Sequence, residues 1–168
     1  VHPDDKLAAQ RGFINGKTEM WYVLGANEGA QLISGFNKEI NKEDYLEHFE
    51  NKKLNDILNY ENVKKGDVFF IPAGRIHAIG PGILLTEIQQ TSDITYRVYD
   101  WDRTDDNGQK RELHTKLAEH ATKHFDSNGK AEYHIKQNES ANLVNCEYFA
   151  TNILNINKHQ TKDYSTLN

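Results

Sequence analysis

Between residues 66 and 101 the sequence is a series of short apolar runs separated by glycine and proline. The runs "GDVFFIPAG", "RIHAIG", "GILLTEIQQ" and "ITYRVYDW" are rich in β-branched and aromatic residues, and several of them alternate apolar with polar residues in part. Alternation with a period of two is typical of half-buried β-strands, and closely spaced Gly and Pro mark turns. The earlier runs "KTEMWYVLG" and "AQLISGF" have the same character. Strands this short and closely spaced predict a mainly β fold, an antiparallel sandwich or barrel of jelly-roll type.

Other segments depart from this period. Residues 4–11 predict a short helix capped by Asp4. Within residues 41–63, apolar side chains recur at steps of three and four, which predicts a helical insert of two helices broken near Asn51. We therefore expect a jelly-roll domain over residues 1–110 that includes this insert. A helical connector at 111–126 and the beginning of a second β unit at 127–168 should follow.

Composition narrows the class of protein. The net charge of -5 argues against nucleic acid as a partner, because phosphate binding requires clustered Lys and Arg. No apolar run is long enough to span a membrane, and the single cysteine, Cys146, excludes an internal disulfide framework. We therefore expect a cytoplasmic protein without a membrane partner. Because the chain begins with Val1 rather than Met, we also expect it to be a piece of a longer protein.

Three residues of types that bind metals or take part in catalysis follow one another at intervals of ten in the β region: His77, Glu87 and Arg97. A histidine beside apolar residues is more often a core or surface residue than a ligand. Glu87 and Arg97 have equally plain interpretations, as a carboxylate on a sheet face and a salt-bridge arginine. Their significance depends on whether they converge with other polar groups.

Two further candidate ligands, His2 and Glu19, precede them. Glu19 shares one face of its predicted strand with Trp21 and Val23. A carboxylate on such a face is costly to bury without a cation or hydrogen-bond partners. The residues alone leave two interpretations open, a metal ligand or an ion pair with Lys17 or an arginine at the rim.

Several motifs resemble those of one enzyme family. "VHPDD", "GKTEMWYVL", "RELH" and above all "IPAGRIHAIG" and "EIQQTSDITYRVYD" are similar to the zinc-dependent class I mannose-6-phosphate isomerases in their short bacterial form. The resemblance implies a cupin, a jelly-roll barrel whose mouth holds one Zn²⁺ per chain. It further implies that His2, Glu19 and His77 are zinc ligands, together with a glutamine that would stand one position before Val1.

The resemblance also implies a catalytic set. Arg97 matches the family's catalytic arginine, and Lys17, Glu87 and Asp93 match positions that line the same pocket. Conversion of mannose 6-phosphate to fructose 6-phosphate moves a proton between C2 and C1 through an enediolate. This chemistry suits a Lewis-acid metal, a fixed cation and a base. Glu87 and Asp93 are the carboxylate candidates for the base, with Lys17 or a ligand histidine as rivals, and the implied partner is a small sugar phosphate.

Two other functions stay open, a cupin that binds a sugar phosphate without turnover and an inactive fragment of the isomerase. An iron oxygenase of the cupin class is disfavoured, because the sequence lacks a His-x-His pair followed by the later Glu and His. The histidines outside the matched motifs are expected on the surface: His48, His114, His120, His124, His134 and His159.

Overall fold

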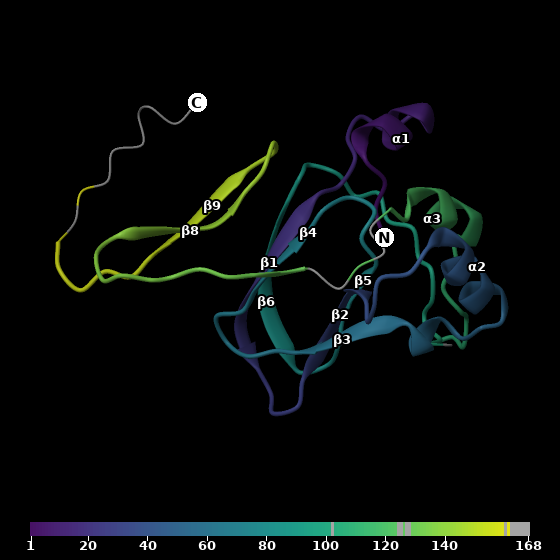
Figure 1. The fold of residues 1–168 in the computed structure, drawn as a ribbon, viewed down its shortest axis with the longest axis horizontal. Helices are drawn as coiled ribbons and strands as arrows, with labels where there is room; N and C mark the ends of the chain where they lie inside the picture. The colour runs from purple at the N-terminus through teal and green to yellow at the C-terminus, as the bar shows by residue number, and fades with distance from the viewer. Residues whose placement is uncertain (102, 124–125, 127–128, 160, 162–168) are drawn as a thin grey trace.

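The computed structural model describes residues 1–101, 103–123, 126, 129–159 and 161, and it is mainly β (Figure 1). The strands are β1 (Glu19–Ala26), β2 (Gln31–Phe36), β3 (Leu58–Asn62), β4 (Val68–Ile71), β5 (His77–Ile79), β6 (Ile83–Gln89), β7 (Lys130–Ala131), β8 (Ser140–Asn145) and β9 (Ala150–Leu154). The helices are α1 (Asp5–Gln10), α2 (Lys42–Glu50), the 3₁₀ turn η1 (Leu54–Asp56) and α3 (Thr115–Ala121). The predicted mainly β fold class is confirmed.

The strands form one four-stranded sheet, one three-stranded sheet and one hairpin. The larger sheet has the order β6-β1-β4-β7, the smaller one β3-β2-β5, and β8 pairs with β9. These named strands all pair antiparallel within the described residues. The short connections from β1 to β2, β3 to β4, β4 to β5 and β5 to β6 each pass from one of the two larger sheets to the other.

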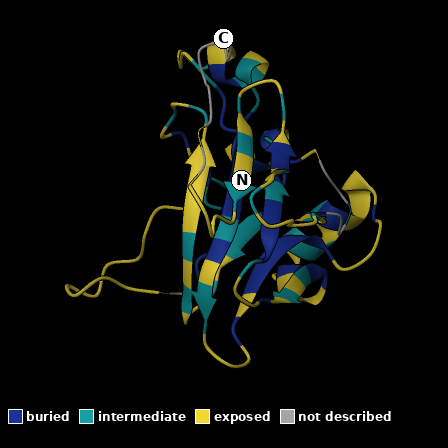
Figure 2. Ribbon diagram, turned by 90° about the vertical axis from the view of Figure 1, so that its left-hand side faces the viewer, coloured by how far each residue is buried: buried dark blue, intermediate teal, exposed yellow. Residues whose placement is uncertain are grey.

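The two faces of β1 pack against different partners, as its alternating sequence predicts. Trp21 and Val23 of one face join side chains of β2 and β4 in a buried cluster between the two larger sheets. Met20 of the opposite face packs with β4 and with Leu143 and Val144 of β8, so the hairpin covers the outside of the four-stranded sheet. The buried residues gather along the central strands (Figure 2).

A third core cluster lies beneath the helices. α2 and α3 lie side by side at the opposite side of the molecule from the hairpin (Figure 1), and Lys42 of α2 is 3.7 Å from Glu119 of α3. Tyr45 and Ala118 are buried there with β2, β3 and the segment 94–98. None of the helices in the described part of the chain is both long and apolar enough to cross a membrane.

The predicted helical insert is only half helical. α2 begins after Asn41, whose side chain caps Asp44 N at 2.7 Å, and it ends before Asn51, where a break was predicted. The second predicted helix is wrong, because it is reduced to the single turn η1 and residues 58–62 form β3. Pairing of β3 with β2 supplies backbone hydrogen bonds that the local apolar spacing does not reveal.

Two predicted strands are also wrong. Residues 94–101 keep the predicted alternation, with Ile94, Tyr96 and Val98 buried, but they form no ladder with a neighbouring strand. Their backbone bonds run instead to Val1 and His114. In the predicted second β unit, the first strand-like run "EYHIKQNES" is not a strand over residues 132–139 either, whereas β8 and β9 pair as a hairpin. The division at residues 110 and 126 stays a prediction.

Candidate metal centre

Three distant segments bring two imidazoles and a carboxylate together. His2 lies just before α1, Glu19 is the first residue of β1, and His77 is the first residue of β5. One ligand atom from each residue lies within 4.8 Å of the others. Glu19 is 1% exposed and His2 is 4% exposed, so the cluster is almost closed to water.

Backbone carbonyls determine which nitrogen each histidine offers. The Nδ1 of His2 donates to the carbonyl of Ile94 at 2.7 Å, and the Nδ1 of His77 donates to the carbonyl of Arg75 at 2.8 Å. A neutral imidazole carries one N–H, so both Nε2 atoms are then acceptors. They lie 3.1 Å apart with no proton to share. Two lone pairs aimed at one volume are the arrangement that a metal ion uses, with the other ring nitrogen held by a backbone oxygen.

Glu19 completes the cluster as a buried carboxylate. Among the described residues neither of its oxygens accepts a hydrogen bond. Oε2 lies 3.4 Å from His2 Nε2, and Oε1 lies 3.5 Å from His77 Nε2. A buried carboxylate is costly unless a cation compensates it, and Lys17, whose Nζ lies 3.2 Å from Oε2, compensates Glu19 from one side. These donors therefore fit a metal ion with nitrogen and oxygen ligands.

The protonation states suit metal binding. Burial lowers the pKa of His2 and lowers that of His77 well below its usual value, so both rings are neutral at neutral pH. Burial alone would raise the pKa of Glu19, but the imidazoles of His2 and His77 in their protonated forms, together with the ammonium of Lys17, outweigh it and lower this pKa to about 2. The cluster thus offers two neutral imidazoles and one anion, the forms in which these groups bind metals.

Lys17 and Glu87 lie next to the cluster. The Nζ of Lys17 is 3.2 Å from Glu19 Oε2 and 3.4 Å from Glu87 Oε1. The other oxygen of Glu87 accepts a hydrogen bond from the indole Nε1 of Trp21 at 2.9 Å. Trp21 also contacts His77 edge-on, with ring centroids 5.3 Å apart. Glu87 is therefore held on both oxygens beside the candidate ligands.

A cavity of about 390 Å³ connects these groups. Lys17, Glu87 and Arg97 line it together with the three candidate ligands. The guanidinium of Arg97 donates to the carbonyl of Glu112 at 2.8 Å, which restrains its position. Asp93 is exposed and does not contribute to this lining, so the structure does not bring it to the cluster.

Other residues of the cavity were not singled out from the sequence. Trp21, Trp101 and Arg103 line it, as do Asp100 and Arg111, which pair through two hydrogen bonds. The position of Trp21 on the face of Glu19 was a usable signal. The remaining four lie in loops or irregular segments, where no periodic pattern indicates the direction of a side chain.

The remaining histidines are peripheral to the cluster. His120, His134 and His159 are exposed as predicted, whereas His48 and His114 are half-buried. His114 is not a free surface residue, because its Nδ1 accepts a hydrogen bond from Arg97 N at 3.2 Å. His124 lies outside the described residues.

Comparison with known proteins identifies several relatives that are all named as the same enzyme. The chain is 47% identical over 114 residues to "Mannose-6-phosphate isomerase" of Streptococcus mutans and 38% identical over 161 residues to "Mannose-6-phosphate isomerase ManA" of Bacillus subtilis. The crystal structure of the mannose 6-phosphate isomerase from Bacillus subtilis superimposes with a TM-score of 0.80 and 35% identity over 90% of this chain. The chain is a homologue of the mannose-6-phosphate isomerases.

The homology also supports the predicted cupin fold. It covers most of this chain but only part of each isomerase. The matches cover 68% of this chain and 36% of the Streptococcus relative, and 93% of this chain and 50% of ManA. The superposition covers 49% of the solved isomerase. The chain therefore spans about a third to a half of the length of these isomerases. No family model matches it.

Proposed function

We propose that this chain carries the metal site of an aldose–ketose isomerase that interconverts mannose 6-phosphate and fructose 6-phosphate. One observation carries the proposal: His2, Glu19 and His77 converge in the same cavity as Lys17, Glu87 and Arg97. The names of the relatives supply the reaction, since the geometry alone is compatible with other metal-assisted chemistry on small polar molecules.

The ligands in this proposal are His2 Nε2, His77 Nε2 and a carboxylate oxygen of Glu19. Two nitrogens and one oxygen suit Zn²⁺, which is commonly bound by three protein ligands at catalytic sites with a further position open. When bound there, zinc would act as a Lewis acid toward the oxygens on C1 and C2 of the sugar. Buried imidazoles that stay neutral and a carboxylate that stays charged keep the ligands ready for it.

Arg97 stabilises developing charge in this scheme. Removal of the proton from C2 leaves negative charge on the enediolate oxygens, and a fixed guanidinium lowers the energy of that state without reorganising. The bond to the carbonyl of Glu112 provides the restraint. Because an arginine does not lose its proton near neutral pH, Arg97 acts as a cation rather than as the base.

Glu87 is the carboxylate that this proposal assigns as the base. Indole and ammonium groups hold its two oxygens, and its side chain is 33% exposed, so it lies at the wall of the cavity within reach of a bound sugar. A base in this position can take the proton from one carbon and return it to the neighbouring carbon. Asp93, the other carboxylate candidate, is exposed away from the cavity lining, and Lys17 is paired with two carboxylates.

The test is a zinc titration combined with a coupled assay for fructose 6-phosphate. We expect the chain to bind one zinc ion, Glu19→Gln to weaken binding at least tenfold, and the exposed-histidine control His134→Ala to bind normally. Glu87→Gln should retain zinc and lose turnover. Zinc binding without turnover by this chain, but with turnover after upstream extension, would identify an inactive fragment. Binding of the sugar phosphate without turnover in both would favour the non-catalytic cupin.

A further inference from the structure

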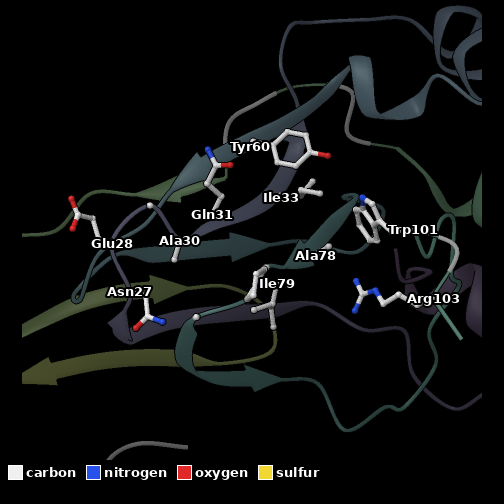
Figure 3. A pocket seen from close by; sticks show the side chains of 14 residues that line it. Asn27, Glu28, Ala30, Gln31, Ile33, Tyr60, Ala78, Ile79, Trp101 and Arg103 are labelled. Atoms are coloured by element: carbon white, nitrogen blue, oxygen red, sulfur yellow. The ribbon is translucent and has the colours of Figure 1, made fainter. Parts of the chain in front are cut away.

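Residues 97–101 form a wall of the metal cavity without belonging to a sheet. All five residues line that cavity, yet in the described part of the chain none of them joins a strand ladder. The segment continues to Arg103, whose guanidinium lies 5.3 Å from the ring centroid of Trp101 at the border of a neighbouring groove of about 890 Å³ (Figure 3). Because strand pairing does not fix this wall, other contacts must hold the side chains that it carries.

A second segment, residues 111–114, supplies such contacts. It is the run "RELH", one of the family motifs, and the candidate metal ligands do not explain it. Arg111 pairs with Asp100 through two hydrogen bonds, and the carbonyl of Glu112 accepts a hydrogen bond from the guanidinium of Arg97 at 2.8 Å. The segment 111–114 therefore lies along the wall and bonds it at several points.

His114 bonds both backbone polar groups of Arg97. The main-chain N–H of His114 donates to the carbonyl of Arg97 at 2.8 Å, and the main-chain N–H of Arg97 donates to the imidazole Nδ1 of His114 at 3.2 Å. The first bond is available to any residue at position 114 that has a main-chain N–H. The second requires a side chain with an acceptor at the correct distance, which a neutral imidazole provides through its unprotonated nitrogen.

The place of His114 in the fold supports a role directed at Arg97. His114 is the N-cap residue of α3, a position that favours Ser, Thr, Asn and Asp because their side chains accept from a free N–H of the first turn. The side chain of His114 makes no such bond to the helix. Its ring is half-buried and lies 6.2 Å from that of Tyr96, measured between centroids, and its acceptor is used by Arg97 instead.

We propose that His114 is a positioning residue for Arg97, which fixes the main chain at position 97 and thereby directs the guanidinium into the metal cavity. This inference rests on the proposed function for what Arg97 does there. A guanidinium stabilises developing charge only where its donors already point at the anion, and small displacements cost much of the rate. The carbonyl of Glu112 holds the other end of the side chain, so one segment restrains Arg97 at its backbone and at its guanidinium.

Amide hydrogen exchange of Arg97, followed by NMR, tests the contact without requiring turnover. His114→Phe keeps an aromatic ring but removes the acceptor, so the exchange rate of the Arg97 N–H should rise at least tenfold. His114→Asn carries an oxygen at the place of Nδ1 and should restore most of the protection. His114→Ser can cap α3, but its hydroxyl ends one atom earlier, so its Arg97 N–H should exchange as fast as in His114→Phe.

Kinetics test the consequence, on this chain or on its upstream extension, whichever turns over the sugar. His114→Phe should lower kcat roughly tenfold to a hundredfold with little change in KM, because Arg97 acts on the transition state. His114→Asn should recover most of kcat, and zinc affinity should be unchanged in both variants. His120→Phe, at an exposed position of the same helix, is the matched control and should keep full activity.

A double-mutant cycle shows whether His114 acts through Arg97. Added to Arg97→Gln, His114→Phe should cost no further activity. The inference is wrong if His114→Phe leaves the exchange of Arg97 unchanged, leaves kcat unchanged, or lowers kcat equally with and without Arg97. If the exchange of Arg97 depends on His114 but neither form of the protein turns over the sugar, the placement of Arg97 by His114 stands and the proposed function fails.

Discussion

Trp21 and Glu87 are directly opposed in the β1–β6 ladder, and the indole Nε1 of Trp21 donates to Glu87 Oε2 at 2.9 Å. Side chains that face each other across antiparallel strands lie close enough to interact on the same face of the sheet. The pairing thus places the proposed base by strand register. The same face carries Glu19, so one ladder positions a candidate ligand and the candidate base together.

Trp21→Phe tests this relationship. The ring remains in the core, but the N–H that holds Glu87 is lost, so turnover should fall at least tenfold while zinc binding remains. We expect a stability loss of about 1–2 kcal/mol from the missing hydrogen bond and the smaller ring. Tyr22→Phe, on the opposite face of the same strand, should retain turnover. Full activity of Trp21→Phe would exclude a positioning role for the indole.

Lys17→Met should make the stability of the chain dependent on zinc. Removal of the ammonium leaves the buried Glu19 uncompensated, which is expected to cost about 3 kcal/mol in the metal-free protein. Zinc held by His2, Glu19 and His77 should restore most of this loss. Urea unfolding with and without zinc measures the difference.

The matched control for that experiment is Lys130→Met. Lys130 also pairs with a carboxylate, that of Asp67 at 2.9 Å, but it lies away from the candidate ligands. The stability that the chain loses on Lys130→Met should be the same with and without zinc. An equal effect of zinc on both variants would show that the ion does not replace the charge of Lys17.

The contact between Asp5 and Tyr148 should stabilise the fold only in a middle pH range. Hydrogen bonds from Gly16, Gln90 and Tyr148 lower the pKa of Asp5 below 3.8, so its contribution is present above that pH and is lost as the pH falls through the folded value. Burial and the bond to Asp5 raise the pKa of Tyr148 from 10.0 to about 12. The contribution of the hydroxyl is therefore present below pH 10 and is lost as the pH rises toward 12.

Thermal melts across pH check this expectation. Tyr148→Phe should lower Tm between about pH 5 and pH 9 and should converge with the unmodified chain at both extremes. Asp5→Asn should show its deficit at neutral pH and lose it in acid. A deficit of Tyr148→Phe that stays constant from pH 3 to pH 11 would exclude the hydrogen bond of 2.9 Å as its cause.

Gly35→Ala should destabilise the chain far more than Gly12→Ala. Both glycines have positive φ, 72° and 82°, so both substitutions carry the cost of about 1 kcal/mol for a side chain in that region. A Cβ at Gly35 would also lie 2.0 Å from the carbonyl oxygen of Asp126, whereas one at Gly12 would meet nothing within 4 Å. We expect an additional loss of about 2 kcal/mol or more at Gly35, measured by urea unfolding. Equal losses would show that backbone conformation alone decides the effect.

The sequence predicts those features that depend on local pattern. Alternation along β1 correctly places Glu19 on the face of Trp21, and the side-chain capping of α1 by Asp4 is confirmed. The family motifs identify His2, Glu19 and His77, which the structure brings together.

Features that depend on pairing between distant segments escape such patterns. Leu54, Ile57 and Leu58 have helical spacing, yet residues 58–62 join β2 because the strand pairing is non-local. The hydrogen bond of Trp21 with Glu87 requires the β1–β6 register, and the stacking of Arg103 on Trp101 requires the path of an irregular segment. Neither register nor loop path is encoded in the spacing of apolar residues.

The backbone carbonyls of Ile94 and Arg75 determine which mutations can change the orientation of the two histidine rings. They orient His2 and His77 through main-chain oxygens, so every amino acid at positions 94 and 75 supplies the same acceptor. Substitutions there can alter packing or the ion pair of Arg75 with Asp126 without changing which tautomer each ring adopts. Loop movements that displace the peptide groups would rotate the rings even with every coordinating side chain intact. Robustness to mutation and sensitivity to backbone displacement are thus two results of the same design.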